Sequence, residues 1–165
     1  MDRRVCPEAA PTIHTYNILI DCYRHMHRLE LGFAIFGRLL KSGLGPDVVS
    51  YSTLIDGFSK EGEVDKAYGL FRDMKEHGIL PDVVTYSSLI NGLCKTKAMD
   101  KAESVLQQMV DAGVRPGNET YNSLIYGYST MGMWKESARR TIAAMKMFNE
   151  MIESGTAVSI SPGDG

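Results

Sequence analysis

Cysteine and histidine are the residues of this chain that could carry nucleophilic or metal chemistry, and their spacing supports neither. The three cysteines, Cys6, Cys22 and Cys94, form no Cys-x-x-Cys pair and no zinc-site spacing with histidine. His25 and His27 are two residues apart, so they face different directions on a helix. No nucleophile–base pairing or glycine-rich phosphate loop stands out. We therefore expect reduced thiols, no catalytic residue, no metal, no cofactor and no small-molecule substrate.

Charge and hydropathy narrow the class of partner. The 165 residues include 18 Lys and Arg against 20 Asp and Glu, a net charge of -2, which argues against binding nucleic acid through bulk positive charge. Any affinity for nucleic acid must come from a few well-placed side chains. No apolar run approaches the roughly 18 residues that span a bilayer, so we expect no membrane partner. The first residues form neither a signal nor a transit peptide, which predicts a cytoplasmic location if the chain is complete.

Several residue types recur at intervals of 35 residues, which indicates a duplicated structural unit. They are Tyr16, Tyr51, Tyr86 and Tyr121, a Leu-Ile pair three residues after each tyrosine, Gly43, Gly78 and Gly113, and Pro46, Pro81 and Pro116. In the second unit, apolar residues follow helical spacing over 51–58 and again over 64–74, separated by a polar turn. Gly78 suits the left-handed position after a helix, and Pro81 prevents its continuation. Each unit is therefore predicted to be two helices.

One helical hairpin cannot bury its apolar face alone, so the units must stack. We predict an all-α fold, an α-solenoid of stacked 35-residue helix-turn-helix repeats. Its predicted divisions are an N-terminal extension (1–12), repeats at 13–47, 48–82 and 83–117, an altered fourth repeat (118–155) and a disordered tail (156–165). In the fourth repeat Phe148, Met151 and Gly155 keep register only if the second helix is longer by about two turns. We expect a fragment or truncated relative of a longer array.

The segments 48–58 and 83–95, with Gly78, Pro81 and Asp82 closing the second unit, resemble the pentatricopeptide repeat. The resemblance covers residues 13–155, and the sequence is most similar to the P-class, restorer-of-fertility-like branch of plant organelle proteins. The resemblance implies sequence-selective binding of single-stranded RNA, namely mitochondrial or plastid transcripts during processing, stabilisation or translation. It also leaves room for protein partners in an organelle RNA-processing complex.

In that family each repeat selects one base with its fifth and its last residue, a short polar side chain reading one base edge. The pairs that result are Asn17 with Asp47, Ser52 with Asp82, Ser87 with Gly117, and Asn122 alone. The first pair is similar to a uracil reader and the second to a guanine-preferring pair. Gly117 has no side chain with which to choose, and Asn122 indicates a pyrimidine. The resemblance thus implies a uracil followed by a guanine-like purine, and we expect Asn17 to be exposed.

The same resemblance assigns stacking and phosphate contacts. His14, Val49 and Val84 stand where the family sandwiches bases, whereas Glu119 departs from the pattern. Lys60 and Lys95 match a lysine that contacts the RNA backbone. Units one and four have His25 and Thr130 in its place, which weakens the expected electrostatic contribution. We expect weak, micromolar binding, because few bases have competent selectors.

Each of these residues also has a plainer interpretation. Asp47 and Asp82 precede a helix, where aspartate is a favoured N-cap. The serines and asparagines could be solvated helix residues, the lysines could be solvated residues of a turn, and the recurring tyrosines begin an apolar stripe typical of core. The alternative function is an α-solenoid scaffold that binds protein, or a truncated relative whose RNA binding has decayed.

Overall fold

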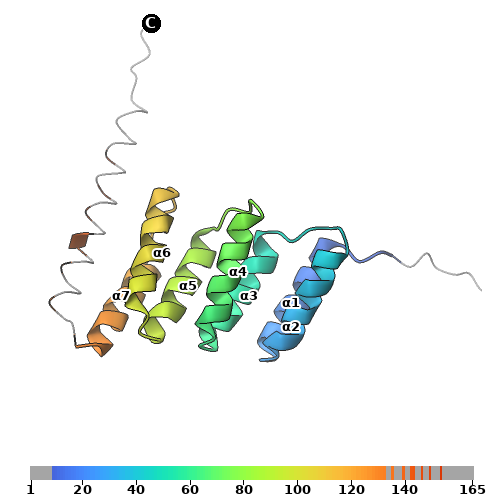
Figure 1. Cartoon of the computed structure of the whole chain (residues 1–165), viewed down its shortest axis with the longest axis horizontal. Coiled ribbons are helices and arrows are strands. Elements are labelled where there is room, and N and C mark those ends of the chain that lie inside the picture. The colour runs from blue at the N-terminus through green and yellow to red at the C-terminus, as the bar shows by residue number, and fades with distance from the viewer. Residues whose placement is uncertain are drawn as a thin grey trace, which may run out of the picture. The chain divides into compact units, whose positions relative to one another are not determined.

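The computed structural model describes residues 9–132 and, beyond them, residues 135, 139, 142, 143, 146, 149 and 153 (Figure 1). It divides into two compact units, Met1–Pro81 and Asp82–Gly165, which are described separately. Phe148, Met151 and Gly155, the predicted lengthened helix that depends on them, the tail 156–165 and Cys6 lie outside the described residues. Between residues 9 and 132 the regular structure is entirely helical, as the repeat pattern predicts.

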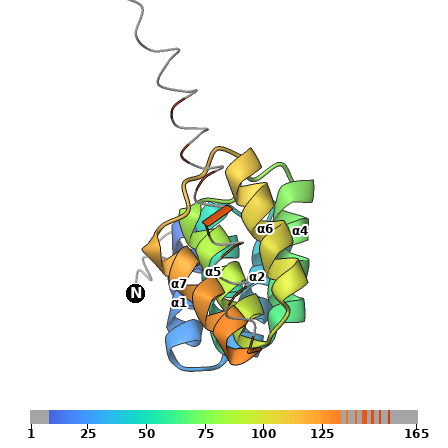
Figure 2. The same ribbon diagram turned by 90° about the vertical axis from the view of Figure 1, so that its left-hand side faces the viewer.

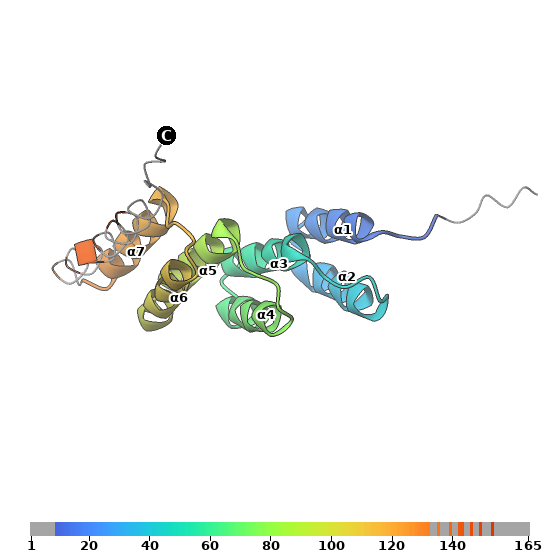
Figure 3. The same ribbon diagram turned by 90° about the horizontal axis from the view of Figure 1, so that it is seen from above.

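The first unit contains two helical hairpins, visible in Figure 3. The first is formed by α1 (Ile13–His25) and α2 (Leu29–Lys41), and the second by α3 (Val48–Lys60) and α4 (Val64–Glu76). In addition to the contacts within each hairpin, α1 packs against α3, and α2 also contacts α3. This is the stacking expected of helices whose apolar face one hairpin cannot cover.

The second unit contains α5 (Val83–Lys95), α6 (Met99–Asp111) and α7 (Asn118–Thr130). Figure 2 shows α6 beside α5 and α7, and α5 packs against both of the others. Each helix between residues 9 and 132 is 13 residues long, so the two helices of each of the first three repeats have equal length.

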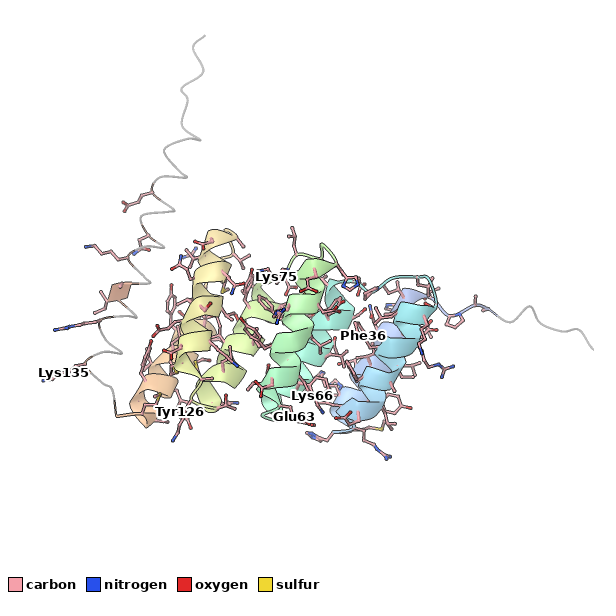
Figure 4. The ribbon with its side chains drawn as sticks, in the orientation of Figure 1. Phe36, Glu63, Lys66, Lys75, Tyr126 and Lys135 are labelled. Atoms are coloured by element: carbon pink, nitrogen blue, oxygen red, sulfur yellow. The ribbon has the colours of Figure 1, made fainter. Side chains whose placement is uncertain are left out.

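The core of the first unit is centred on Tyr51, which is fully buried. Its ring lies 5.0 Å from that of Phe36 in an edge-to-face arrangement that joins α2 to α3. Figure 4 labels Phe36 on α2. The Tyr51 hydroxyl donates to the Asp73 carboxylate of α4 at 2.6 Å, so the polar tip of this buried residue is satisfied. The prediction that the tyrosines are core residues is confirmed for Tyr51 and Tyr86, whereas Tyr16 and Tyr121 are only half-buried.

The helix ends follow the predicted glycine–proline signal. Gly78 and Gly113 have φ angles of +72° and +73°, the left-handed region in which a side chain is disfavoured. After Gly78, the Ile79 N–H donates back to the Met74 carbonyl at 3.0 Å, which satisfies a carbonyl at the end of α4.

The recurrent leucine is an exception to equal burial. Leu54, Leu89 and Leu124 are buried, but Leu19 of α1 is 40% exposed. Leu54 lies against Gly32 of α2, in the preceding hairpin, whereas the described residues place no such hairpin against Leu19. Sequence identity between repeats therefore does not imply equal burial.

Two helical glycines give a test of this packing. A Cβ at Gly57 would collide with the buried Leu29 and press on Arg24, whereas a Cβ at Gly69 would meet no atom within 4 Å. Gly69→Ala should therefore raise the free energy of unfolding by about 0.5–1 kcal/mol through helix propensity. Gly57→Ala should lower it by about 1–2 kcal/mol, because overpacking outweighs the same gain. Urea unfolding followed by circular dichroism measures both; equal effects would contradict the close α2–α3 approach.

Candidate nucleic-acid interface

The first predicted selector pair is in direct contact. The Asn17 side-chain N–H group of α1 donates to the Asp47 carboxylate, at 3.1 and 3.2 Å from its two oxygens. Asp47 is the N-cap of α3, and its carboxylate accepts the Ser50 backbone N–H at 2.9 Å. The capping interpretation of Asp47 is thus confirmed, and the residue holds the selector amide at the same time. The Asp47 carboxylate, at the end of the first repeat, therefore binds the first helix of that repeat (α1) and the first helix of the next repeat (α3).

Asn17 is not the exposed residue that the sequence led us to expect. Only 8% of it is accessible, and the Ser50 hydroxyl donates to its amide oxygen at 2.7 Å in a buried position. The expectation that Asn17 is exposed is therefore wrong, and we expect its replacement to lower the free energy of unfolding, because a buried hydrogen-bonded amide is costly to replace. Solvation also fails as an interpretation of Asn17.

The amide orientation at Asn17 is dictated by its neighbours. A carboxylate only accepts, so the NH₂ group must face Asp47, and the amide oxygen then faces the Ser50 hydroxyl. An amide has two N–H donors and two oxygen lone pairs. One N–H and one lone pair consequently remain for a ligand that reaches the accessible part of Asn17.

Asp47 is held in its charged form. Partial burial raises the pKa of Asp47, but hydrogen bonds from the backbone and side chain of Ser50, from Asn17 and from the Val49 backbone outweigh it. The net result is a pKa below the ordinary value of 3.8. The carboxylate is therefore an acceptor at neutral pH, which fixes the polarity of the whole group.

The members of the second predicted pair belong to different compact units. Ser52 of α3 is half-buried, and its hydroxyl lies 3.3 Å from the Val49 carbonyl. Asp82 is exposed and is the N-cap of α5, where it accepts from the backbone and the hydroxyl of Thr85 at 2.9 and 2.8 Å. Capping is confirmed for Asp82 as for Asp47.

At the third pair the structure supplies a partner that the sequence interpretation missed. Gly117 has no side chain to cap α7, yet its backbone is extended (φ -97°, ψ -179°) like that of Asp82. The Ser87 hydroxyl instead contacts the Thr120 hydroxyl at 3.0 Å, and Thr120 is fully buried. Thr120 stands in α7 where Ser50 stands in α3. Asn122 is exposed.

Ser50 and Thr120 could have been found in the sequence. A hydroxyl residue recurs at the third position of every first helix, 35 residues apart: Thr15, Ser50, Thr85 and Thr120. Each of these hydroxyl residues directly precedes a recurring tyrosine, which is the more conspicuous repeat signal. The signal is a polar residue kept at a buried helix position, where it needs a hydrogen-bond partner.

The predicted stacking residues are accessible. His14 is exposed, and the side chains of Val49 and Val84 are 49% and 54% exposed on the first turns of α3 and α5. Exposed valines at these positions fit apolar contact with a ligand, although isolated apolar residues are common on protein surfaces.

The two predicted phosphate-contacting lysines differ. The Lys60 ammonium lies 2.7 Å from the Asp56 carboxylate, and Arg24 approaches the same carboxylate at 3.5 Å. Part of its charge is therefore already compensated. Lys95 is exposed and forms no ion pair within the described residues. It is the freer cation of the two.

The thiols and acidic groups offer no other centre in the described part of the chain. Burial, and to a lesser extent Glu103, raises the pKa of the Cys94 thiol to about 12, so this cysteine stays protonated and unreactive. Among the described residues, no group of histidine, cysteine and carboxylate side chains has the arrangement of a metal site. None of the described helices is long and apolar enough to span a bilayer.

Known structures share this arrangement of helices. The crystal structure of the pentatricopeptide repeat protein PPR10 from maize matches with a TM-score of 0.73 and 27% identity, over 90% of this chain and 21% of that chain. PPR10 in complex with an 18-nt psaJ RNA element matches with a TM-score of 0.71 and 30% identity, over 86% of this chain and 21% of that chain. The chain therefore spans about a fifth of the maize protein.

A more distant likeness shows the fold alone. The PPR domain of Arabidopsis thaliana protein-only RNase P 1, crystallised in complex with tRNA, matches with a TM-score of 0.68 and 20% identity, over 89% of this chain and 81% of that chain. The predicted fold class, an all-α solenoid of helix-turn-helix repeats, is confirmed by the likeness to the maize structure. A comparison with curated protein sequences gave no significant match.

Family models agree with the structural likeness. The model of the PPR repeat family matches residues 11–60, 46–95 and 88–130, and a second PPR repeat model matches residues 136–156. These matches run through most of the chain and include the hairpins that carry Asn17, Asp47, Ser50 and Ser87. The chain belongs to the PPR repeat family.

Proposed function

We propose that this chain binds single-stranded RNA and selects bases through the polar residues of its first helices. The observation that carries the proposal is the Asn17–Asp47–Ser50 group, in which a buried amide is oriented and keeps one donor and one acceptor unused. That combination matches a base edge that offers an acceptor beside an N–H, as uracil does. The maize relative was solved in complex with an RNA element, which supports the same class of ligand here.

The remaining residues take the roles that the family resemblance implies. Ser52 with Asp82 selects a purine similar to guanine, Ser87 with Gly117 selects weakly, and Asn122 favours a pyrimidine. His14, Val49 and Val84 contact base faces, and Lys60 and Lys95 contact phosphates. Repeats at 13–47, 48–82 and 83–117 would then each read one base. The resemblance of the sequence to the restorer-of-fertility-like branch supports mitochondrial or plastid transcripts as the RNA that this chain binds.

Affinity of the chain alone should be modest. Stacking contributes about 1–3 kcal/mol per base, and association entropy offsets several kcal/mol of the total. The compensation of Lys60 by Asp56 weakens the electrostatic contribution further. We therefore expect micromolar dissociation constants and a shallow dependence on salt.

Exchange of Asn17 for threonine tests base selection directly. The preferred base at the first site should move from uracil towards guanine, and the free energy of unfolding should fall by about 1–3 kcal/mol because a buried amide is removed. Selection of bound sequences from a random single-stranded RNA pool gives the preference, and urea unfolding gives the stability. Gln107→Ala, which removes an exposed side chain of α6 bonded to Asp111, is the control that should change neither. A preference that stays on uracil would assign Asn17 a structural role alone.

A protein-binding scaffold is the second candidate, favoured by apolar side chains on the first unit. Phe33, Leu40 and Leu44 of the first hairpin and its following turn are each more than two-fifths exposed. Exposed apolar residues of this size can form part of a protein contact. Absence of any RNA binding by the intact chain would make this candidate the better one.

A further inference from the structure

The recurring hydroxyl at the third position of the first helices has a role beyond helix capping. Ser50, Thr85 and Thr120 are all fully buried. A buried hydroxyl needs partners, and two of these three find one on the preceding first helix. Ser50 bonds to Asn17, and Thr120 bonds to Ser87. In both cases the partner is the residue proposed to face the base.

The Ser50 hydroxyl is at the centre of its group. It accepts the Asp47 backbone N–H at 3.3 Å. The Ser50 oxygen lies 2.7 Å from the Asn17 amide oxygen and 2.8 Å from an Asp47 carboxylate oxygen, so its single proton can be donated to either. A hydroxyl has one proton, so the two acceptors share it. The amide of Asn17 is thus held at its oxygen by Ser50 and at its nitrogen by Asp47.

We propose that Ser50 and Thr120 are positioning residues for base selection, setting which hydrogen-bonding group Asn17 and Ser87 present to the RNA. The inference rests on the proposed RNA-binding function and adds a residue to each site. At Asn17 both ends of the amide are fixed, so one base edge is favoured. The hydroxyl is the only neighbour that holds the amide oxygen among the described residues.

At Ser87 the same device works with less constraint. Gly117 supplies no carboxylate, so among the described residues the Thr120 hydroxyl has no charged acceptor that fixes its proton. Either hydroxyl can donate to the other at 3.0 Å. When Thr120 donates, Ser87 keeps its proton for the base; when Ser87 donates, it offers the base a lone pair. The third site therefore accepts base edges that donate and base edges that accept. Its tolerance of several bases thus follows from the two directions of the Ser87–Thr120 hydrogen bond as well as from the lack of a side chain at Gly117.

The test compares Ser50→Ala with Ser50→Thr in the intact chain. Loss of the hydroxyl should lower the ratio of uracil to other bases at the first site about threefold to tenfold, the equivalent of one hydrogen bond. Threonine, which stands at this position in the other repeats, should restore the ratio. Base preference is measured by selection from a random single-stranded RNA pool and by fluorescence anisotropy with oligonucleotides that differ in one base.

Ser59→Ala is the matched control, because Ser59 is a buried serine of the same helix whose hydroxyl has no partner among the described residues. Its base preference should equal that of the original chain. If Ser50→Ala is too unstable to test, Thr120→Ala and Thr120→Ser replace it, and only the alanine variant should change the third-base distribution.

The outcomes separate this inference from the proposed function. Unchanged uracil preference in folded Ser50→Ala, with clear preference in the original chain, overturns the positioning role and leaves RNA binding intact. An original chain that binds RNA with no base preference, or does not bind it, overturns the proposed function and the positioning role together. Loss of preference in both alanine and threonine variants would show that packing, not the hydroxyl, matters.

Discussion

Asp47→Ala is expected to lower the free energy of unfolding by about 2–4 kcal/mol and to abolish base preference at the first site. Two losses add in this variant. Removal of an aspartate N-cap costs about 1 kcal/mol, and the buried Asn17 amide left without its acceptor costs about 1–3 kcal/mol. The Asn17 amide then keeps Ser50 as its one hydrogen-bond partner among the described residues and can turn, so uracil loses its advantage.

Asp82→Ala is the matched control. Asp82 caps α5 with the same pair of bonds, from the backbone and hydroxyl of Thr85, but it is exposed. Its replacement should cost about 1 kcal/mol, the value of a cap alone. Urea unfolding of both variants gives the difference, which measures the Asn17–Asp47 contact. Equal losses would mean that this contact adds nothing to the cap.

The stability difference should also depend on pH. The pKa of Asp47 is lowered in the folded chain, so the carboxylate contributes stability that is fully present above its ordinary pKa of 3.8 and is lost as the pH falls through the folded pKa. The gap between the original chain and Asp47→Ala should therefore be constant around neutral pH and shrink below about pH 4. A gap that grows on acidification would contradict the charged acceptor.

The repeat pattern was sufficient to predict the helices because each signal has a local cause. Gly78 and Gly113 mark positive φ, and aspartate at 47 and 82 marks a helix start, whichever repeats surround them. Apolar spacing likewise predicted the buried Phe71 of α4. These features depend on a few neighbouring residues, which the sequence states directly.

The candidate site was predicted less completely because its contacts connect residues about one repeat apart. The sequence identified Asn17 and Asp47 through the family resemblance, but burial of Asn17 depends on how α1 packs against α3. The role of Ser50 is likewise tertiary, since its hydroxyl reaches Asn17 only when the two helices are stacked. The exposure of Leu19 was also not predictable from the repeat pattern. Leu19 matches Leu54 in residue type and repeat position, yet it is partly exposed.

The third site offers a gain of selectivity, because its backbone already matches the first two. Gly117 is extended like Asp82, and a Cβ built there meets no atom within 4 Å, so aspartate fits without strain. The Thr120 hydroxyl stands where Ser50 stands. Gly117→Asp together with Ser87→Asn should rebuild the complete group of the first site in the second unit.

The double variant should therefore acquire a uracil preference at the third base, about fivefold to tenfold for roughly 1 kcal/mol of discrimination. Gly117→Asp alone leaves Ser87 as the base-facing residue, the same combination as Ser52 with Asp82, and should move the third base towards guanine instead. Stability should rise by only a few tenths of a kcal/mol, since aspartate and glycine caps differ little. Selection from a random RNA pool distinguishes the three chains at one position while the first two bases act as internal references. If both variants leave the third base as tolerant as before, the aspartate at the end of a repeat is a helix cap and no more, and the orientation of Asn17 by Asp47 has no bearing on RNA.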